Sequence, residues 1–360
     1  MLAFAFDVGN GFVKAKNGKR TLIAPSTIAK KESVGSSSII SMSTDYDTNS
    51  GYNEFESQLD DGEVYIWGEG IKQAVDPDSL IQTYTHNNRY NQKRFKLLCS
   101  FILAELASDY EDYELDEITV VTGVPSQEVG TKESEEFKRF LQQKHVITKN
   151  GVQRMINVTD VRIIEQPLGT LLNEYMNETG QILKELTTST FTVIDFGAGT
   201  TIMDTFKNLK RLDDKSETFY EGMNDIHKRI AKRIEREQGV KGLDASFVEE
   251  GFRNGKLIAE ISERRKYPFE EIAEEVIIDF VEKRISDIDT TLTNRNSIDK
   301  FILTGGGVNI VGNVFKKLFN EETLQVVNNS QEANIGGFYK LSNAITKKNK
   351  RTKQEARINA

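Results

Sequence analysis

Two stretches of the sequence decide the fold: FAFDVGNG at residues 4–11 and TVIDFGAG at residues 192–199. Each contains an apolar run, then an aspartate, then two glycines separated by one residue, and each leads into a further β-prone run. An apolar run, a glycine turn and a second apolar run predict a β-hairpin. Because the two copies lie about half the chain apart, the sequence predicts two halves built on the same plan.

The glycines of these two turns favour binding of an anion. Glycine lets backbone N–H groups turn outward and approach an anion closely, so two such hairpin tips could hold a polyphosphate. Asp7 and Asp195 at the strand ends would repel phosphate unless a divalent cation lay between, and Mg²⁺ supplies that charge. One such turn alone is more often structural, since Asp and Gly are good turn residues. Two copies half a chain apart favour a function.

Further glycine segments follow the same plan. Residues 305–307 (GGG) come after a predicted strand at 300–303, and residues 336–337 (GG) open the last predicted helix. The chain has no Gly-x-x-x-x-Gly-Lys-Ser/Thr sequence, which excludes a P-loop, and residues 68–70 (GEG) lack the third glycine of a dinucleotide fingerprint. Phosphates would therefore be held by the hairpin tips.

Composition limits the class of protein. The 360 residues include 47 Lys and Arg and 55 Asp and Glu, and the net charge of −8 argues against binding bare nucleic acid through the overall field. With one cysteine, Cys99, and three widely separated histidines, an internal disulfide and Cys/His zinc sites are excluded. The apolar start meets Asp7 far too early for a membrane or secretory segment. We expect a cytoplasmic globular protein with no membrane contact and no direct, specific DNA binding.

Hydrophobic periodicity predicts an α/β chain. Helices are expected over 89–107, 132–144, 168–176, 224–237 and 270–285, and strands over 117–125, 161–164, 191–194 and 300–303. A stretch rich in Ser, Asp, Asn and Gly at 31–63 predicts a loop-rich insertion with short strands. The basic segment from Thr346 onward lacks large apolar residues, so a disordered tail is expected there.

Together the motifs resemble those of the actin, Hsp70 and sugar-kinase ATPase superfamily. Residues 7–14 are similar to its first phosphate motif and residues 195–201 to its second. Residues 303–308 resemble its adenosine motif, 164–169 its first connecting helix and 334–337 its second. All five motifs occur in the family's order and cover nearly the whole chain. Within the superfamily, the chain is most similar to bacterial actin homologues of the plasmid-segregating ParM type.

The resemblance implies an α/β, actin-like ATPase fold: two similar RNase H-like domains around a nucleotide cleft, each with a smaller inserted subdomain. Domain I would span residues 1–175, with its loop-rich small subdomain at about 31–65. A C-terminal helix at about 334–345 would pack back onto domain I. Domain II would span residues 176–333, and a basic tail would follow at 346–360.

The resemblance also implies which residues hold ATP, or GTP, and Mg²⁺. The residues expected to bind the β- and γ-phosphates are Gly9, Asn10, Gly11 and Lys14 from one domain and Gly197, Ala198, Gly199 and Thr200 from the other. Close to the adenosine, the backbone would pass through Gly305, Gly306 and Gly307, with Gly336 on the same side. Asp7 and Asp195 would orient Mg²⁺ and its waters, which also makes Asp195 a catalytic residue.

The residue that positions the attacking water stays open between two neighbours. The family has Glu or Gln directly before the small-residue turn of the first connecting helix, and here Glu165 and Gln166 are adjacent. Gln166 is preferred because it directly precedes Pro167, where the family residue usually lies, although Glu165 is the stronger base. The alternative for Gln166 is a purely structural polar residue at a helix N-terminus.

For function, the family implies an ATPase that assembles into nucleotide-dependent filaments. The expected partners are further copies of the chain and an adaptor protein bound to centromere-like plasmid DNA, which the filament would segregate. A small-molecule kinase and a monomeric Hsp70-like regulatory ATPase of the same fold stay open as alternatives. The insertion at 31–63 favours the filament, since the corresponding small subdomain of actin homologues makes longitudinal contacts.

Overall fold

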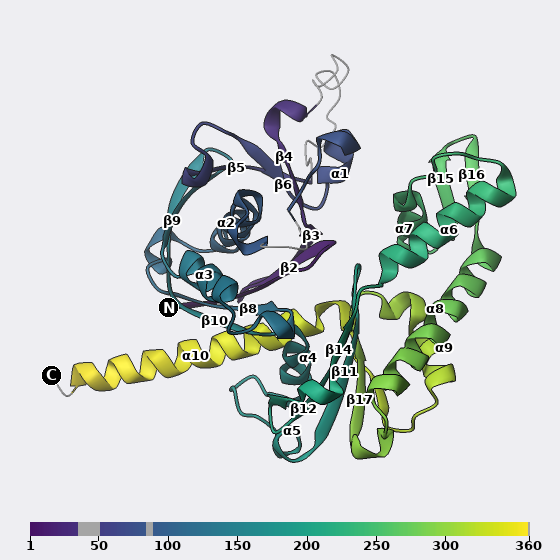
Figure 1. Cartoon of the computed structure of the whole chain (residues 1–360). Helices are drawn as coiled ribbons and strands as arrows, with labels where there is room; N and C mark the ends of the chain where they lie inside the picture. The colour runs from purple at the N-terminus through teal and green to yellow at the C-terminus, as the bar shows by residue number, and fades with distance from the viewer. Residues whose placement is uncertain (35–50, 84–88, 359–360) are drawn as a thin grey trace. The chain divides into compact units, whose positions relative to one another are not determined.

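The computed structural model describes residues 1–34, 51–83 and 89–358, which divide into two compact units (Figure 1). Unit 1 comprises Met1–Gln181 and Asn334–Ala360, and unit 2 comprises Ile182–Ala333. The chain therefore leaves unit 1 once, builds unit 2 and returns to unit 1 with its last helix. Much of the insertion predicted at 31–63 lies outside the described residues.

A mixed sheet forms the centre of unit 1. In its described part the strand order is β3-β2-β1-β8-β10-β9-β5-β6-β4-β7. The hairpin of β1 (Leu2–Val8) and β2 (Phe12–Lys16) lies beside β8 (Ile118–Val124), which pairs in parallel with both β1 and β10 (Val152–Glu165). The predicted first hairpin and the strand at 117–125 are therefore confirmed.

The remaining elements of unit 1 extend or cover this sheet. The strands are β3 (Thr21–Pro25), β4 (Thr27–Lys30), β5 (Asn53–Ser57), β6 (Tyr65–Trp67), β7 (Ile81–Gln82) and β9 (Lys144–Lys149). The helices are α1 (Ile71–Ala74), α2 (Lys93–Ala107), α3 (Lys132–Leu141), α4 (Gln166–Tyr175) and α10 (Ala333–Ile358). No helix within the described ranges is long and apolar enough to cross a membrane.

Alternation along β1 assigns the two faces of the sheet to different helices. Phe4 and Phe6 belong to the larger core, together with buried residues of α2 and α3. Ala5, between them, belongs to a second cluster with Ile335 and Phe338 of α10. Successive side chains of a strand point to opposite faces, so α2 and α3 cover one face and α10 covers the other.

Two predictions for unit 1 are wrong. The helix expected over 132–144 ends at Leu141, because residues 144–149 form β9 and pair with the first half of β10. The tail expected to be disordered from Thr346 continues α10 as far as Ile358. Thr346 is buried, and Lys353 makes an ion pair with Glu117 at 2.5 Å, so contacts with unit 1 support this part of the helix.

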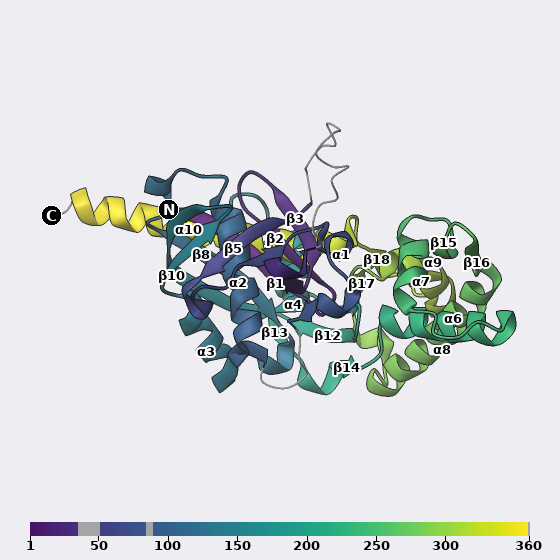
Figure 2. The ribbon, with the colours of Figure 1, turned by 90° about the horizontal axis from the view of Figure 1, so that it is seen from above.

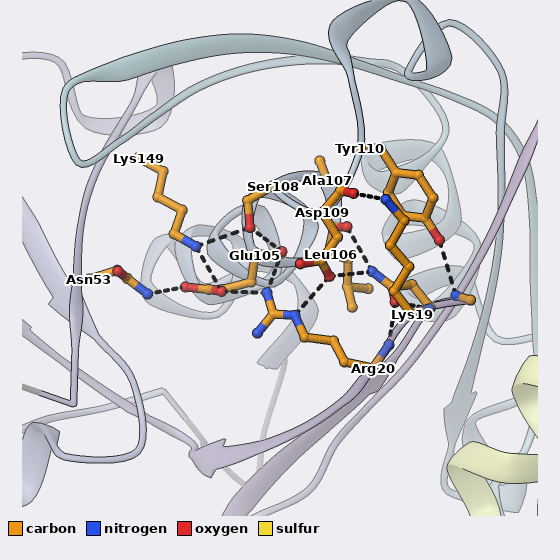
Figure 3. Close-up of polar contacts among 12 residues, drawn as sticks. Lys19, Arg20, Asn53, Glu105, Leu106, Ala107, Ser108, Asp109, Tyr110 and Lys149 are labelled. Carbon is orange, nitrogen blue, oxygen red and sulfur yellow. Dashed lines mark hydrogen bonds and ion pairs between the residues drawn. The ribbon is translucent and has the colours of Figure 1, made fainter. Parts of the chain in front are cut away.

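A buried carboxylate in unit 1 ties the start of β3 to two other strands of the sheet (Figure 3). Glu105 of α2 is 4% exposed and accepts hydrogen bonds from Arg20 at 2.9 Å, Lys149 at 2.9 Å and Asn53 at 2.5 Å. Arg20 directly precedes β3, Lys149 lies on β9 and Asn53 on β5. A buried charge costs little only when it is paired and hydrogen-bonded. Glu105 therefore holds three strands at one end of α2.

Replacing Glu105 by Gln should lower the free energy of unfolding by about 2 kcal/mol, since Arg20 and Lys149 would lose the negative charge that compensates them. Urea unfolding followed by circular dichroism measures the change. Glu69→Gln, at an exposed position of the same unit, serves as the control and should stay within about 0.5 kcal/mol of wild type. Equal stability of the two variants would contradict the bracing role of Glu105.

Unit 2 repeats the central plan of unit 1. β11 (Thr190–Phe196) and β12 (Thr201–Lys207) form an antiparallel hairpin, and β17 (Lys300–Thr304) pairs in parallel with both β11 and β18 (Leu324–Val326). The predicted second hairpin and the strand at 300–303 are confirmed. The short strands β13 (Lys210–Arg211) and β14 (Glu217–Phe219) both pair with β12 in this sheet, and the short helix α5 (Lys184–Thr188) precedes β11.

The larger helices of unit 2 share one core with Ile194 and Phe196 of β11. They are α6 (Met223–Gln238), α8 (Glu270–Thr291) and α9 (Val308–Phe319). Between α6 and α8 the chain inserts α7 (Ala245–Arg253) and the hairpin of β15 (Ile258–Ser262) and β16 (Arg265–Pro268). Figure 2 shows this inserted hairpin beside α6 and α7 within unit 2.

Candidate functional site

The first glycine turn lies at the carboxyl end of β1 in unit 1. The N–H of Gly9 donates to the carbonyl of Phe12 at 3.0 Å, which closes the hairpin. Among the described residues, the N–H groups of Asn10 and Gly11 have no acceptor. Unpaired N–H groups in a tight turn form a concavity that suits an anion. The turn therefore presents the donors that the sequence predicts there.

Ser26 supports this turn from the neighbouring strands. Its hydroxyl donates to the carbonyl of Gly9 at 2.7 Å, and its N–H donates to the carbonyl of Gly11 at 3.0 Å. The carbonyls of Gly9 and Gly11 are therefore both hydrogen-bonded to Ser26. The N–H groups of Asn10 and Gly11 stay available to a ligand. Sequence analysis does not single out Ser26, because its contacts with the turn span more than a dozen residues of chain.

Asp7 and Gln166 meet in unit 1 although 159 positions separate them in the sequence. Nε2 of Gln166 donates to Oδ1 of Asp7 at 2.6 Å, and Asp7 is 5% exposed. Gln166 is the first residue of α4, while Glu165 ends β10 in register with Val124 of β8. Of the two candidate neighbours, Gln166 is the one that hydrogen-bonds to Asp7 in the described structure. On β2, Lys14 lies in register with Asp7.

The absence of a side chain at Gly123 of β8 leaves space for the side chain of Gln166. A Cβ at position 123 would lie 2.9 Å from Cγ of Gln166 and 2.3 Å from the ring of Phe338 on α10. Any side chain there would displace Gln166 or Phe338. The sequence contains no signal for this requirement, since both neighbours are distant in the chain.

The second glycine turn, in unit 2, has the same character. The N–H of Gly197 donates to the carbonyl of Thr200 at 2.9 Å. The carbonyls of Gly197 and Ala198 accept from the first N–H groups of α6, Met223 at 3.1 Å and Asn224 at 2.8 Å. Within the described ranges, three N–H groups of the turn have no acceptor: those of Ala198, Gly199 and Thr200. The carbonyls are bound by the helix and the donors stay available.

Asp195 lies beside the triple-glycine segment of unit 2. It is 9% exposed and stands in parallel register with Thr304 of β17. Gly305 follows with φ of +96°, and a Cβ there would lie 2.2 Å from Oδ1 of Asp195. The N–H of Gly307 donates to the carbonyl of Phe196 at 2.9 Å. The glycines thus allow the backbone to approach Asp195 more closely than any other residue would.

Gly336 lies in unit 1 and packs against α4. It lies near the start of α10 in unit 1, where a Cβ would stand 2.3 Å from Oδ1 of Asn173 on α4. A Cβ at Gly337 would lie 1.8 Å from the carbonyl oxygen of Gly169. These two glycines therefore let α10 and α4 pack closely within unit 1, whereas residues 305–307 belong to unit 2.

Two residues before α6 support the second turn and were not singled out by sequence analysis as site residues. A Cβ at Gly222 would lie 2.7 Å from the carbonyls of Gly197 and Ala198. The carbonyl of Glu221 accepts from the hydroxyl of Thr201 at 3.0 Å. The Glu221 carboxylate is bonded by Lys283 at 2.7 Å, and this bond lowers the pKa of the carboxyl. The Glu-Gly pair directly before a predicted helix is the available sequence signal.

The chemistry of the two units is therefore alike. Each places an aspartate at the end of a strand beside a turn whose N–H groups are unpaired, an arrangement suited to an anion and a hard cation. Two α/β units of this kind, joined so that the last helix returns to the first unit, define a two-domain protein of the actin-like class.

Comparisons with known proteins agree with this class. The family model for the N-terminal domain of actin-like proteins matches residues 5–169, and the model for the C-terminal domain of archaeal, MreB-like actin homologues matches residues 193–317. The chain belongs to the actin-like superfamily, and within it the chain resembles ParM proteins. No curated protein sequence matches it.

Solved structures share the fold over nearly the whole chain. The apo pSK41 ParM protein is 29% identical, with a TM-score of 0.74 over 96% of this chain and 98% of its own. The archaeal actin homologue Ta0583 is 19% identical, with a TM-score of 0.76 over 94% and 98%. A ParM from a 15-stranded filament of Clostridium botulinum is 18% identical, with a TM-score of 0.73 over 95% and 99%.

Replacing Gly305 by Ala should destabilise unit 2 by about 2 kcal/mol or more, because a Cβ would overlap Asp195 and the positive φ is strained for alanine. Gly306→Ala is the matched control, since among the described atoms its Cβ would meet only Cγ of Gln331, at 3.9 Å. Thermal unfolding of both variants measures the difference. If the two lose the same stability, the close approach of Gly305 to Asp195 is not a constraint on the fold.

Proposed function

We propose that the protein is a cytoplasmic ATPase that assembles into nucleotide-dependent filaments. The observation that carries the proposal is the pair of glycine turns, each with unpaired N–H groups beside an aspartate that ends a strand. Related proteins support it: Ta0583 is known in complex with ADP, a Bacillus thuringiensis ParM with ATP, and the Clostridium botulinum ParM as a filament.

Both turns contribute to nucleotide binding in this proposal. In unit 1 the N–H groups of Asn10 and Gly11 and the ammonium of Lys14 would bind the β- and γ-phosphates. In unit 2 the N–H groups of Ala198, Gly199 and Thr200 would bind the same phosphates. Gly305, Gly306 and Gly307 would let the chain approach the nucleoside, and Gly9 and Gly197 close the two hairpins. The phosphate contacts are common to ATP and GTP, so either nucleotide fits them.

Asp7 and Asp195 fit a role toward Mg²⁺. The described residues contain no group of three or more His, Cys, Asp or Glu side chains that could bind a metal by themselves. Mg²⁺ is commonly bound by one or two carboxylates together with phosphate oxygens and water, which suits two separate aspartates. When bound, the ion neutralises charge on the phosphates. Asp7 and Asp195 would orient its water shell.

Gln166 is the proposed positioning group for the attacking water. Its amide nitrogen donates to Asp7, so its amide oxygen is the atom left to accept a hydrogen bond from water. An amide does not take up a proton at neutral pH, and Gln166 would therefore orient the water rather than act as a general base. Glu165 ends a strand and is the alternative for the same role.

Nucleotide would act on assembly by changing which conformation is populated. Two turns that bind one polyphosphate favour the conformation in which both reach it, and the loss of the γ-phosphate removes part of that preference. The filament would move plasmid DNA through an adaptor protein bound to a centromere-like site, as the resemblance to ParM implies.

Wild-type protein at tens of micromolar should form particles that scatter light and sediment when ATP and Mg²⁺ are added. This protein concentration is about the range expected for a contact of modest area. GTP is tested in parallel, and ADP should give far less assembly. Gly197→Val is the control, because a side chain there would press on the Thr200 carbonyl and disturb the second turn. Protein that stays monomeric with ATP or GTP would overturn the filament and favour a small-molecule kinase or a regulatory ATPase.

Gln166→Ala should slow phosphate release by about 100-fold or more while nucleotide affinity changes less than about threefold, since a residue that aligns water acts on the transition state. Filaments of this variant should outlast those of wild type. Glu165→Ala is the matched neighbour and should keep most of the activity. Loss of activity in Glu165→Ala with retention in Gln166→Ala would assign the role to Glu165.

A further inference from the structure

The end of α10 carries a dense positive charge. Six basic residues and one acidic residue give residues 346–360 a formal charge of +5, so the other 345 residues carry −13 of the total of −8. Lys347, Lys348, Lys350, Arg351 and Lys353 are all exposed. Residues 347–357 contain Ala356 as their single apolar residue. This part of the helix therefore has no apolar face with which to pack.

Contacts with unit 1 use only part of this charge. Lys347 donates to the carbonyl of Glu178 at 3.2 Å, and Lys353 pairs with Glu117. In the described structure Lys348, Lys350 and Arg351 have no partner. Like charges three or four positions apart destabilise a helix, and Lys347 stands in that relation to both Lys350 and Arg351. An opposite charge from outside would relieve this repulsion.

A stripe of opposite charge lies on α8 in unit 2. Five exposed carboxylates, each one, three or four positions from the next, fall on one side of the helix: Glu271, Glu274, Glu275, Asp279 and Glu282. Glu275 pairs with Arg233 at 2.6 Å. The other four have no partner among the described residues. The opposite side of α8 supplies buried residues such as Val276 and Phe280 to the core, so the acidic stripe faces away from it.

We propose that the basic end of α10 in one copy of the chain docks on the acidic stripe of α8 in the next copy. The inference rests on the proposed assembly into filaments and specifies one contact within it. Each copy carries one basic segment and one acidic stripe, so the contact is heterologous and can repeat without limit. Charge complementarity of this kind sets the register and speeds the encounter of two surfaces.

A second copy fits these features better than a nucleic acid does. Outside residues 346–360 the chain is strongly negative, and that charge repels a nucleic acid while it attracts the basic helix of another copy. The acidic stripe is also long enough to receive the basic segment, since residues 347–353 span about 9 Å and residues 271–282 about 17 Å at 1.5 Å per residue.

Charge reversal of each surface tests the contact. One variant carries Lys348→Glu and Arg351→Glu, and the other carries Glu274→Lys and Glu282→Lys. With ATP and Mg²⁺, each variant alone should need about fivefold more protein than wild type to sediment, because like charges then face one another. A 1:1 mixture of the two should assemble at close to the wild-type concentration. A control with Glu263→Lys and Glu322→Lys, exposed positions elsewhere in unit 2, should behave as wild type.

The mixture separates the proposal from its alternatives. Rescue by mixing requires that the two surfaces meet between copies, and a misfolded variant would not be rescued. If the four changes restore assembly only when they are in the same chain, the contact is within one copy and the proposal is wrong. If the α10 variant assembles as wild type does, the proposal is also wrong and the filament stands. If wild type itself does not assemble, the proposed function fails and this inference fails with it.

Discussion

Parallel pairing of β1 with β8, and of β11 with β17, is the constraint on which the rest of each unit depends. Parallel strands bring their carboxyl ends to the same edge of a sheet. In unit 1 that edge collects the turn after Asp7, the end of β8 and the start of α4, because Glu165 is in register with Val124. In unit 2 the register of Asp195 with Thr304 brings the triple glycine directly beside the second turn. Residues far apart in the chain thus become neighbours without any local signal between them.

At this edge, the side chains of Gln166 and Asp195 must lie very close to the backbone of a neighbouring segment. Gln166 can lie against β8 because position 123 has no side chain, and Asp195 can lie against the next loop because position 305 has none. Glycine at such places costs conformational entropy on folding. Gly62, Gly130 and Gly151 differ, since no atom of the described residues lies within 4 Å of the Cβ that each would carry. The structure therefore separates glycines that make room for a functional side chain from glycines that only turn the chain.

Sequence reasoning succeeded where hydrophobic periodicity is strong and failed where long-range contacts decide. The two hairpins, α2, β8, α6 and β17 carry apolar patterns that stand out from their flanks. β9 is mostly polar, and in the first half of β10 and in α7, β15 and β16 charged residues interrupt the apolar ones, so their pairing could not be inferred locally. α9 has buried residues at 308, 311, 315 and 319, a helical spacing that is a sufficient sequence signal for this helix. The Asp7 and Gln166 pair agrees with the family resemblance, whereas Ser26 and Gly123 depend on contacts that no short segment contains.

α10 links the two proposals physically. Near its start, Phe338 lies against Gly123 and Gly169, the residues that flank Gln166 in space and in sequence. Its far end carries the basic surface proposed to meet the next copy. One continuous helix of 26 residues, about 39 Å long, therefore connects the packing beside Gln166 with the surface proposed to meet the next copy.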